Sequence, residues 1–223
     1  MDLIAACEPY RIGFLHEPAN AISSAAFVVA GAGILVASRR SEAWGDRRTV
    51  FGLLVAGVGV GSFIQHGPHP DWQAYAHDLP LAAVLIFGTA DAVADLTGRE
   101  LSYRWWLIPS VLMIPVVASG ATASTVAQAV IAAAAIGGNL LRAARRPLVC
   151  RVLISALVIA AAGATIGSPS DPISVCRGDG LLPRHAIWHI LAAAALWRLA
   201  TVIGSRRAPF LAKGKAASVG SSL

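Results

Sequence analysis

Seven long apolar stretches, separated by short segments rich in arginine, dominate the pattern of hydrophobic and polar positions along the chain. Each comes close to the ~20 residues that an α-helix needs to cross a bilayer. The stretches cover residues 19–38, 49–66, 78–96, 104–119, 121–141, 148–166 and 182–203. Only Ser119 and Gly120 separate the fourth stretch from the fifth, so a count of six is the alternative. A glycine between two runs of spanning length favours a tight turn, and we therefore expect seven transmembrane helices.

The composition agrees with a protein embedded in a membrane. Hydrophobic residues make up 56% of the chain and charged residues only 13%, and the mean hydropathy is +0.65. An ordinary soluble domain is less apolar and carries about twice this share of charge. We therefore predict an all-α polytopic membrane protein, with residues 1–203 forming one seven-helix transmembrane bundle. Residues 204–223, rich in basic residues, serine and glycine, read as a disordered basic tail.

The placement of basic residues predicts the orientation of the bundle. Of the 18 Lys and Arg residues, 15 follow the first, third and fifth stretches or lie near the C-terminus. Because short cytoplasmic loops retain positive charge, we expect the N-terminus outside and the C-terminus in the cytoplasm. The basic balance then reflects topology and contact with anionic lipid headgroups, and no nucleic-acid-binding motif is present. Arginine outnumbers lysine 16 to 2, which suggests a GC-rich bacterial genome and hence the inner membrane.

Three histidines near the ends of these stretches form the strongest chemical pattern. His185 and His189 are four residues apart, so a helix places them on one face, one turn apart. His66 ends the second stretch, and the predicted topology brings it to the same outer, periplasmic side. Three imidazoles that bind zinc leave a fourth position open for water, as in catalytic sites. The alternative is that these rings lie at the headgroup level as ordinary interfacial residues.

Two further residues are candidates for catalysis beside such a metal. Asp78, at the start of the third stretch, could deprotonate water and then protonate a leaving amine, or it could be the N-cap of that helix. Ser62, one turn before His66, could donate a hydrogen bond to a developing oxyanion, or bond to a backbone carbonyl. His69 and His77 fall in the polar outer segment, and we interpret both as loop residues rather than metal ligands.

Several short motifs together resemble the alkaline ceramidases and their bacterial relatives, within the CREST-type superfamily of seven-helix membrane hydrolases that includes the adiponectin-receptor-like proteins. The motifs are Cys7-Glu8, Glu17-Pro18-x-Asn20-x-x-Ser23, Gly61-Ser62-Phe63-x-x-His66, Asp78-x-Pro80 and His185-Ala186-x-Trp188-His189. The resemblance covers nearly the whole chain. It implies zinc bound by His66, His185 and His189, with Ser62 and Asp78 beside it. It also implies cleavage of the amide bond of ceramide or another N-acyl lipid, with activated water attacking the acyl carbonyl.

The same resemblance implies a calcium site in the N-terminal segment. Glu8, Glu17 and Asn20 match part of that pattern, whereas Ala5 and Ala6 offer no side-chain oxygen. Calcium usually takes six or more oxygen ligands, so we do not expect a complete calcium site. Glu17 with Pro18 could instead simply open the first helix.

The cysteines and the charged residues inside the predicted spans are expected to have structural roles. Cys7 and Cys176 both fall outside in the predicted topology, where an oxidising compartment favours a disulfide between them, as in similar enzymes. Cys150 should stay reduced on the cytoplasmic side. Asp91 and Arg198 lie at comparable depth and are expected to pair, while Asp95 is expected to face cytoplasmic water.

A non-enzymatic function is the main alternative to a hydrolase. A retinal protein is disfavoured because residues 182–203 contain no lysine for a Schiff base. A metal transporter should carry polar residues through the middle of the membrane, yet the fifth and sixth stretches are almost entirely aliphatic. A seven-helix receptor or metal-handling protein with a structural metal is the alternative that the sequence leaves open.

Overall fold

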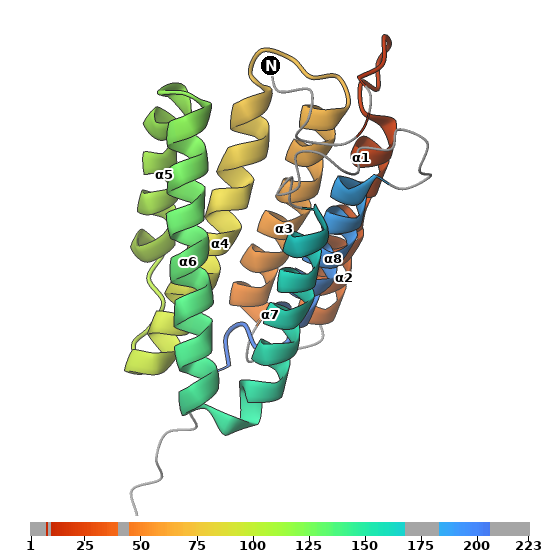
Figure 1. Ribbon diagram of the computed structural model, residues 1–223. Helices are drawn as coiled ribbons and strands as arrows, with labels where there is room; N and C mark the ends of the chain where they lie inside the picture. Colours follow the sequence, from red (N-terminus) through yellow and green to blue (C-terminus); the bar gives the residue numbers. More distant parts are fainter. Residues whose placement is uncertain (1–7, 9, 40–44, 168–182, 206–223) are drawn as a thin grey trace, which may run out of the picture.

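The computed structural model describes residues 8, 10–39, 45–167 and 183–205, and this part of the chain is helical without a β-strand. Figure 1 shows the helices packed as one bundle. They are α1 (Pro18–Ser23), α2 (Ala25–Ser38), α3 (Gly45–His66), α4 (Gln73–Thr97), α5 (Arg104–Ala118), α6 (Ala121–Arg145), α7 (Pro147–Gly167) and α8 (Arg184–Ala200). The predicted all-α fold is confirmed.

Each predicted apolar stretch coincides with helix, and five of the helical segments are long and apolar enough to cross a membrane. These five are Pro18–Ser38, Arg47–His66, Gln73–Thr97, Ala121–Arg145 and Pro147–Gly167. Helix α5 has 15 residues and α8 has 17, both shorter than a typical span. Five long apolar helices in the described part of the chain are compatible with an integral membrane protein.

The turn predicted between the fourth and fifth stretches is confirmed. Helix α5 ends at Ala118 and α6 begins at Ala121. Gly120 has a φ of +119°, a backbone conformation that residues with a Cβ atom rarely adopt. A glycine at this position lets the two helices reverse direction within two residues.

Two helices organise the packing of the bundle. Helix α4 packs against α3, α5 and α6, and α8 packs against α2 and α7 and also contacts α1 and α3. Their shared core contains fully buried aromatic rings, including Phe51 and Phe87 with centroids 6.0 Å apart. Because successive helices alternate in direction, the start of α4, the end of α3 and the start of α8 lie at one end of the bundle (Figure 1).

A close approach of α3 to α4 positions that end of the bundle. A Cβ atom at Gly61 would lie only 1.8 Å from the carbonyl oxygen of Ala76. Glycine at this position therefore allows the two backbones to touch, five residues before His66.

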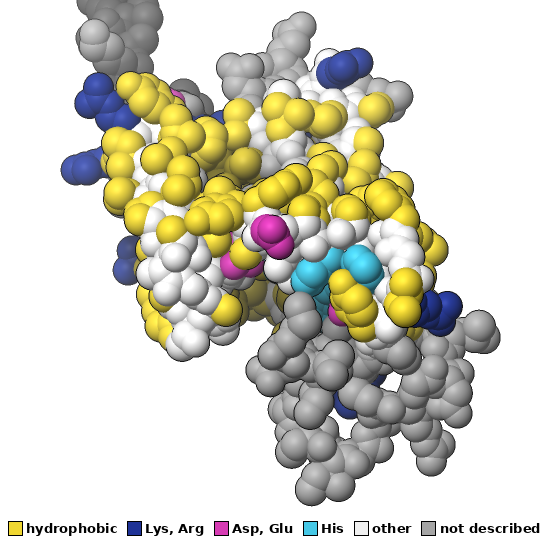
Figure 2. Space-filling model, turned by 90° about the horizontal axis from the view of Figure 1, so that it is seen from above, with side chains coloured by type: hydrophobic (Ala, Val, Ile, Leu, Met, Phe, Trp, Pro, Cys, Tyr) yellow, Lys and Arg dark blue, Asp and Glu magenta, His cyan; other side chains and the backbone are white. Residues whose placement is uncertain are grey.

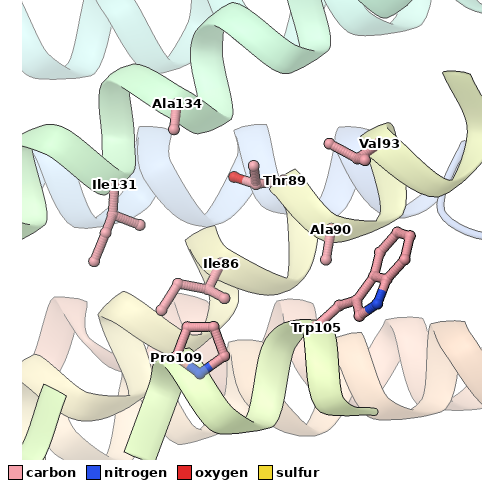
Figure 3. A pocket seen from close by; sticks show the side chains of 8 residues that line it. All are labelled: Ile86, Thr89, Ala90, Val93, Trp105, Pro109, Ile131 and Ala134. Carbon is pink, nitrogen blue, oxygen red and sulfur yellow. The ribbon is translucent and has the colours of Figure 1, made fainter. Parts of the chain in front are cut away.

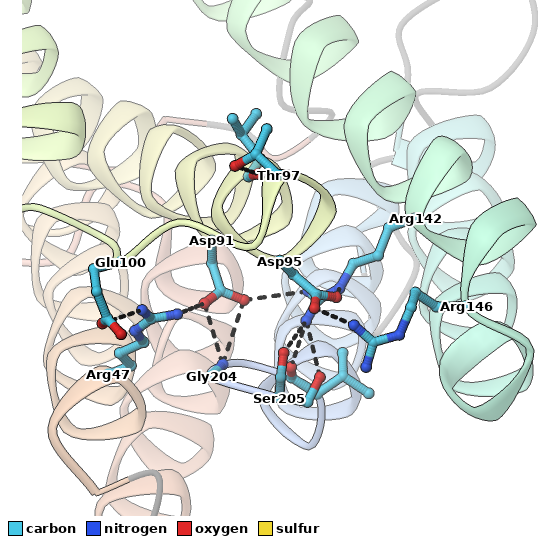
Figure 4. Close-up of polar contacts among 11 residues, drawn as sticks. Arg47, Asp91, Asp95, Thr97, Glu100, Arg142, Arg146, Gly204 and Ser205 are labelled. Atoms are coloured by element: carbon cyan, nitrogen blue, oxygen red, sulfur yellow. Dashed lines mark hydrogen bonds and ion pairs between the residues drawn. The ribbon is translucent and has the colours of Figure 1, made fainter. Parts of the chain in front are cut away.

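The opposite end of the bundle contains a buried network of charges that differs from the expected pairs (Figure 4). The guanidinium of Arg142 is fully buried and donates to Asp91 at 3.2 Å and to Asp95 at 2.7 Å. Arg47 also pairs with Asp91, at 3.2 Å, and Arg146 pairs with Asp95. The network joins α3, α4 and α6.

Two expectations about these charges were therefore wrong. Asp91 does not pair with Arg198, whose Nε atom donates to Ser155 Oγ at 3.0 Å on α7. Comparable depth alone did not suffice as a criterion, because Asp91 is buried inside the bundle whereas Arg198 is exposed. Asp95 is 4% exposed and ion-paired, so it does not face water.

The end of the described chain differs from the expected tail. The predicted tail starts at Gly204, but Gly204 and Ser205 are packed in the bundle: Gly204 N–H donates to Asp91, and Ser205 accepts from Arg142. Cys150 forms no disulfide within the part of the chain that the structure describes, in line with the expectation that it stays reduced. The expected Cys7–Cys176 disulfide and the tail from residue 206 onward lie outside the described residues.

Candidate metal centre

Three imidazoles meet at the end of the bundle where α3 ends and α8 begins. One ring nitrogen from each of His66, His185 and His189 lies within 4.8 Å of the other two. The ring centroids are 4.5 Å apart for His185 and His189, and 5.0 and 5.2 Å from His66 to His185 and His189. Figure 2 shows histidine side chains gathered at this end. The predicted convergence of the three histidines is confirmed.

Glu17 determines which nitrogen of His66 is available to a metal. His66 Nδ1 lies at hydrogen-bond distance from Glu17 Oε2. Burial acts to raise the pKa of Glu17, but hydrogen bonds from His66 and Asn20 hold that pKa below its usual value. An ionised carboxylate only accepts hydrogen bonds, so Nδ1 carries the proton and Nε2 the lone pair. His66 Nε2 is buried without a hydrogen-bond partner among the described atoms. A metal ligand has this arrangement.

His189 is oriented in the same sense by helix α1. Its Nδ1 atom lies 2.8 Å from Ser23 Oγ and 3.2 Å from the carbonyl oxygen of Asn20. The Ser23 hydroxyl itself donates to that carbonyl, so both partners can accept the Nδ1 proton. His189 Nε2 therefore carries the lone pair, 3.3 Å from Ser62 Oγ. Helix α1 and the residue before it thus fix the tautomers of two of the three imidazoles.

This role of the N-terminal segment was missed by sequence reasoning. The motif Glu17-Pro18-x-Asn20-x-x-Ser23 was assigned to calcium or to the helix start, and its spacing places Asn20 and Ser23 on one helical face. Both Glu8 oxygens accept backbone N–H groups, from Ala19 at 2.8 Å and Asn20 at 2.9 Å. Glu8 therefore caps the start of α1. Asn20 Oδ1 is buried without a hydrogen-bond partner in the part of the chain described.

Ser62 is buried beside His189. Its side chain is 1% exposed, and its oxygen accepts a hydrogen bond from Ser24 Oγ at 2.8 Å. The Ser62 hydroxyl is then free to donate toward His189 Nε2. The alternative, a bond to a backbone carbonyl, is not the arrangement found.

Asp78 reaches the cluster through a fourth histidine. Its carboxylate lies 2.7 Å from His77 Nδ1 and accepts from Ser124 Oγ at 2.6 Å. The His77 ring meets His66 edge to face, with centroids 6.4 Å apart. Gln128 donates in turn to Ser124 Oγ at 3.1 Å, so a polar chain runs from α6 to the histidines.

The alternative role given for Asp78 and the loop position predicted for His77 were wrong. Helix α4 begins at Gln73 with Trp72 as its N-cap, so Asp78 lies in its second turn and is not the cap. His77 therefore belongs to the helix and not to the loop, because α4 starts five residues before the apolar stretch does. His69 does lie in the loop. Its ring nitrogen Nδ1 lies 2.6 Å from the carbonyl oxygen of Gln65, and it is not among the three clustered histidines.

Replacing Glu17 with glutamine should weaken metal binding by His66 without unfolding the chain. The amide keeps the shape of the side chain but loses the charge that holds the Nδ1 proton. Loss of such an outer partner typically costs ~10–100-fold in metal affinity. Competition with a zinc chelator would measure the change, with Glu100→Gln, an exposed site at the opposite end, as the control. An unchanged affinity in Glu17→Gln would contradict this role.

Comparison with known proteins adds no family to this geometry, because no family model and no curated protein matches the chain.

Proposed function

We propose that this protein is a zinc-dependent intramembrane hydrolase that cleaves the amide bond of a ceramide-like lipid. The observation that carries the proposal is the cluster of three imidazoles, two of which have Nδ1 bonded to a neighbour so that Nε2 is the nitrogen available to a metal. Imidazole nitrogens suit zinc among the common metals, and three protein ligands are typical of its catalytic sites. When bound, zinc activates water and polarises an acyl carbonyl.

The residues around the cluster have roles that suit amide cleavage. Asp78, held by His77 and Ser124, takes a proton from water and returns it to the leaving amine. Ser62 donates a hydrogen bond to the oxygen of the acyl group as negative charge develops there. Both groups are held by neighbours before substrate arrives, which is the preorganisation that this chemistry needs.

The substrate is proposed to be a lipid because of where the cluster lies. His66 and Asp78 lie on α3 and α4, which are long and apolar enough to cross a membrane, and His185 and His189 meet them from α8 at the same end of the bundle. A lipid whose acyl chain lies in the bilayer presents its amide bond at that depth. Ceramide and other N-acyl lipids, including N-acyl amino lipids, share this arrangement.

The test is release of fatty acid from N-acylsphingosine and from an N-acyl amino lipid by the detergent-purified chain. We expect hydrolysis that a chelator abolishes and zinc restores. Asp78→Asn should lower the turnover number by ~10²–10⁴-fold, the usual contribution of a general acid–base group. Asp71→Asn, at an exposed loop position near the same end, is the matched control.

Zinc-loaded protein that releases no fatty acid from either lipid would refute the hydrolase proposal. That result would favour the alternative, a membrane receptor or metal-handling protein with a structural metal. Activity that survives complete removal of metal would refute the zinc mechanism itself.

A further inference from the structure

A groove lined by apolar side chains lies between α4, α5 and α6, in the half of the bundle away from the histidines. Its volume is about 360 Å³, within the ~300–1,000 Å³ of small-molecule pockets. Figure 3 shows the side chains that form its walls. They include Ile86, Val93, Trp105, Pro109, Ile131 and Ala134. Thr89 also lines the groove. At a rise of 1.5 Å per residue, it lies about 16 Å along α4 from Asp78. The groove is therefore separate from the candidate metal centre.

The walls of this groove suit a hydrocarbon chain. Small side chains, Ala90 on α4 and Ala134 on α6, leave space that larger residues would fill. The hydroxyl of Thr89 is the polar side-chain oxygen in the lining, and it donates to the carbonyl oxygen of Leu85 at 2.8 Å. A ligand in the groove thus finds apolar surface and no free hydroxyl. Because α4 and α6 are both of spanning length, the groove lies at the depth of lipid acyl chains.

Positive charge lies next to one end of the groove. Val93 and Trp105 line that end. Arg99 follows Val93 by six residues in the sequence, and Arg104 directly precedes Trp105. Both arginines are exposed, and neither forms an ion pair within residues 8, 10–39, 45–167 and 183–205. Arg104 is held over the Tyr103 ring, with its guanidinium carbon 5.8 Å from the ring centroid.

A guanidinium is the side chain best suited to bind a phosphate, since its N–H groups match two phosphate oxygens. Basic side chains beside apolar clefts between helices are typical sites for anionic lipid headgroups. A tryptophan at the same level, here Trp105, is usual where a helix meets the headgroup region. We propose that the groove binds one acyl chain of an anionic phospholipid, whose phosphate pairs with Arg99 and Arg104. The inference is independent of the proposed hydrolase activity.

The experiment is native mass spectrometry of the full chain, delipidated in a neutral detergent, titrated with two phospholipids of identical oleoyl chains. Phosphatidylglycerol should bind more tightly than phosphatidylcholine. Arg99→Gln and Arg104→Gln should each weaken phosphatidylglycerol binding by about fivefold, as each basic residue near a lipid surface contributes. Phosphatidylcholine binding should weaken less in these variants, because its choline ammonium offsets the charge of its phosphate.

Filling the groove tests the acyl-chain half of the proposal. Ala134→Trp should reduce the binding of both lipids at least ~10-fold, because an indole occupies much of the space. Ala133→Trp, the neighbouring exposed position outside the groove lining, is the matched control and should bind like the wild type. Equal affinity of the wild type for the two lipids, or equal binding by the two tryptophan variants, would overturn the proposal.

A second measurement does not depend on the folding of the tryptophan variants. Trp105 reports on the groove through the fluorescence difference between the wild type and Trp105→Phe. Phosphatidylglycerol with brominated chains should quench that difference signal more strongly than brominated phosphatidylcholine at the same mole fraction. Equal quenching by the two lipids counts against a site for an anionic phospholipid.

Discussion

His189→Ala is expected to abolish zinc binding by the purified protein. The wild type should contain about one zinc per chain, as a single three-ligand site holds. Removal of an outer partner of a metal ligand already costs ~10–100-fold, so loss of a ligand itself should cost more than ~100-fold. His189 is also held by Ser23 and Asn20, and the other two histidines cannot replace it from α3 and the first turn of α8. Elemental analysis after detergent purification would measure the loss.

The comparison needs variants that separate loss of metal from loss of fold. His185→Ala should lose zinc like His189→Ala, because both rings lie on one face of α8 and belong to the cluster. His69→Ala, in the loop at the same end, should retain zinc. Thermal unfolding in the same detergent checks that all variants are folded. Zinc that survives both substitutions on α8, or a wild type that takes up none, would be incompatible with the proposed centre.

Arg142→Met is expected to destabilise the folded bundle by about 3–5 kcal/mol. The guanidinium of Arg142 is fully buried and bonds to two carboxylates, Asp91 and Asp95. It also donates to the carbonyl oxygen of Val202 at 2.9 Å and to Ser205 Oγ at 2.9 Å. Methionine of similar length would leave these acceptors buried with fewer donors. Chemical or thermal unfolding in detergent would measure the change.

Arg145→Met is the matched control for this prediction. Arg145 lies on the same helix, three residues away, but it is exposed and forms no ion pair in the described part of the chain. Its replacement should change the unfolding free energy by no more than ~0.5 kcal/mol. Adding Asp95→Asn to Arg142→Met should recover part of the lost stability, because it removes one of the two buried carboxylates that lost Arg142 as a partner. Equal effects of Arg142→Met and Arg145→Met would show that the buried network does not stabilise the bundle.

Much of the fold could be predicted because its determinants are local. A run of apolar residues in a membrane must form helix, since the backbone has no water to bond to. The helical repeat places His185 and His189 on one face, and Gly120 permits a turn that other residues strain to make. Alternation of helix direction then brings His66 to the same end as α8. These features depend on spacing and residue type alone.

The partners of the buried polar groups depended on the tertiary structure. Glu17 and His66 are 49 residues apart, and only the packing of α1 against α3 brings them together. Asp91 was expected to pair with Arg198 at comparable depth, but it is buried against Arg142 of α6, whereas Arg198 is exposed. Helix α4 also begins five residues before its apolar stretch, which places His77 in the helix beside the site instead of in the expected loop.

The sequence by itself determined the helices, their order and the three histidines that meet at one end of the bundle. Only the tertiary structure decided how those histidines are held, through Glu17 and helix α1, and where the buried charges at the opposite end find partners. The physical reason is that hydrophobicity and helical repeat act within a segment. Helix rotation and close backbone approach, as at Gly61, are set by the packing of several segments at once.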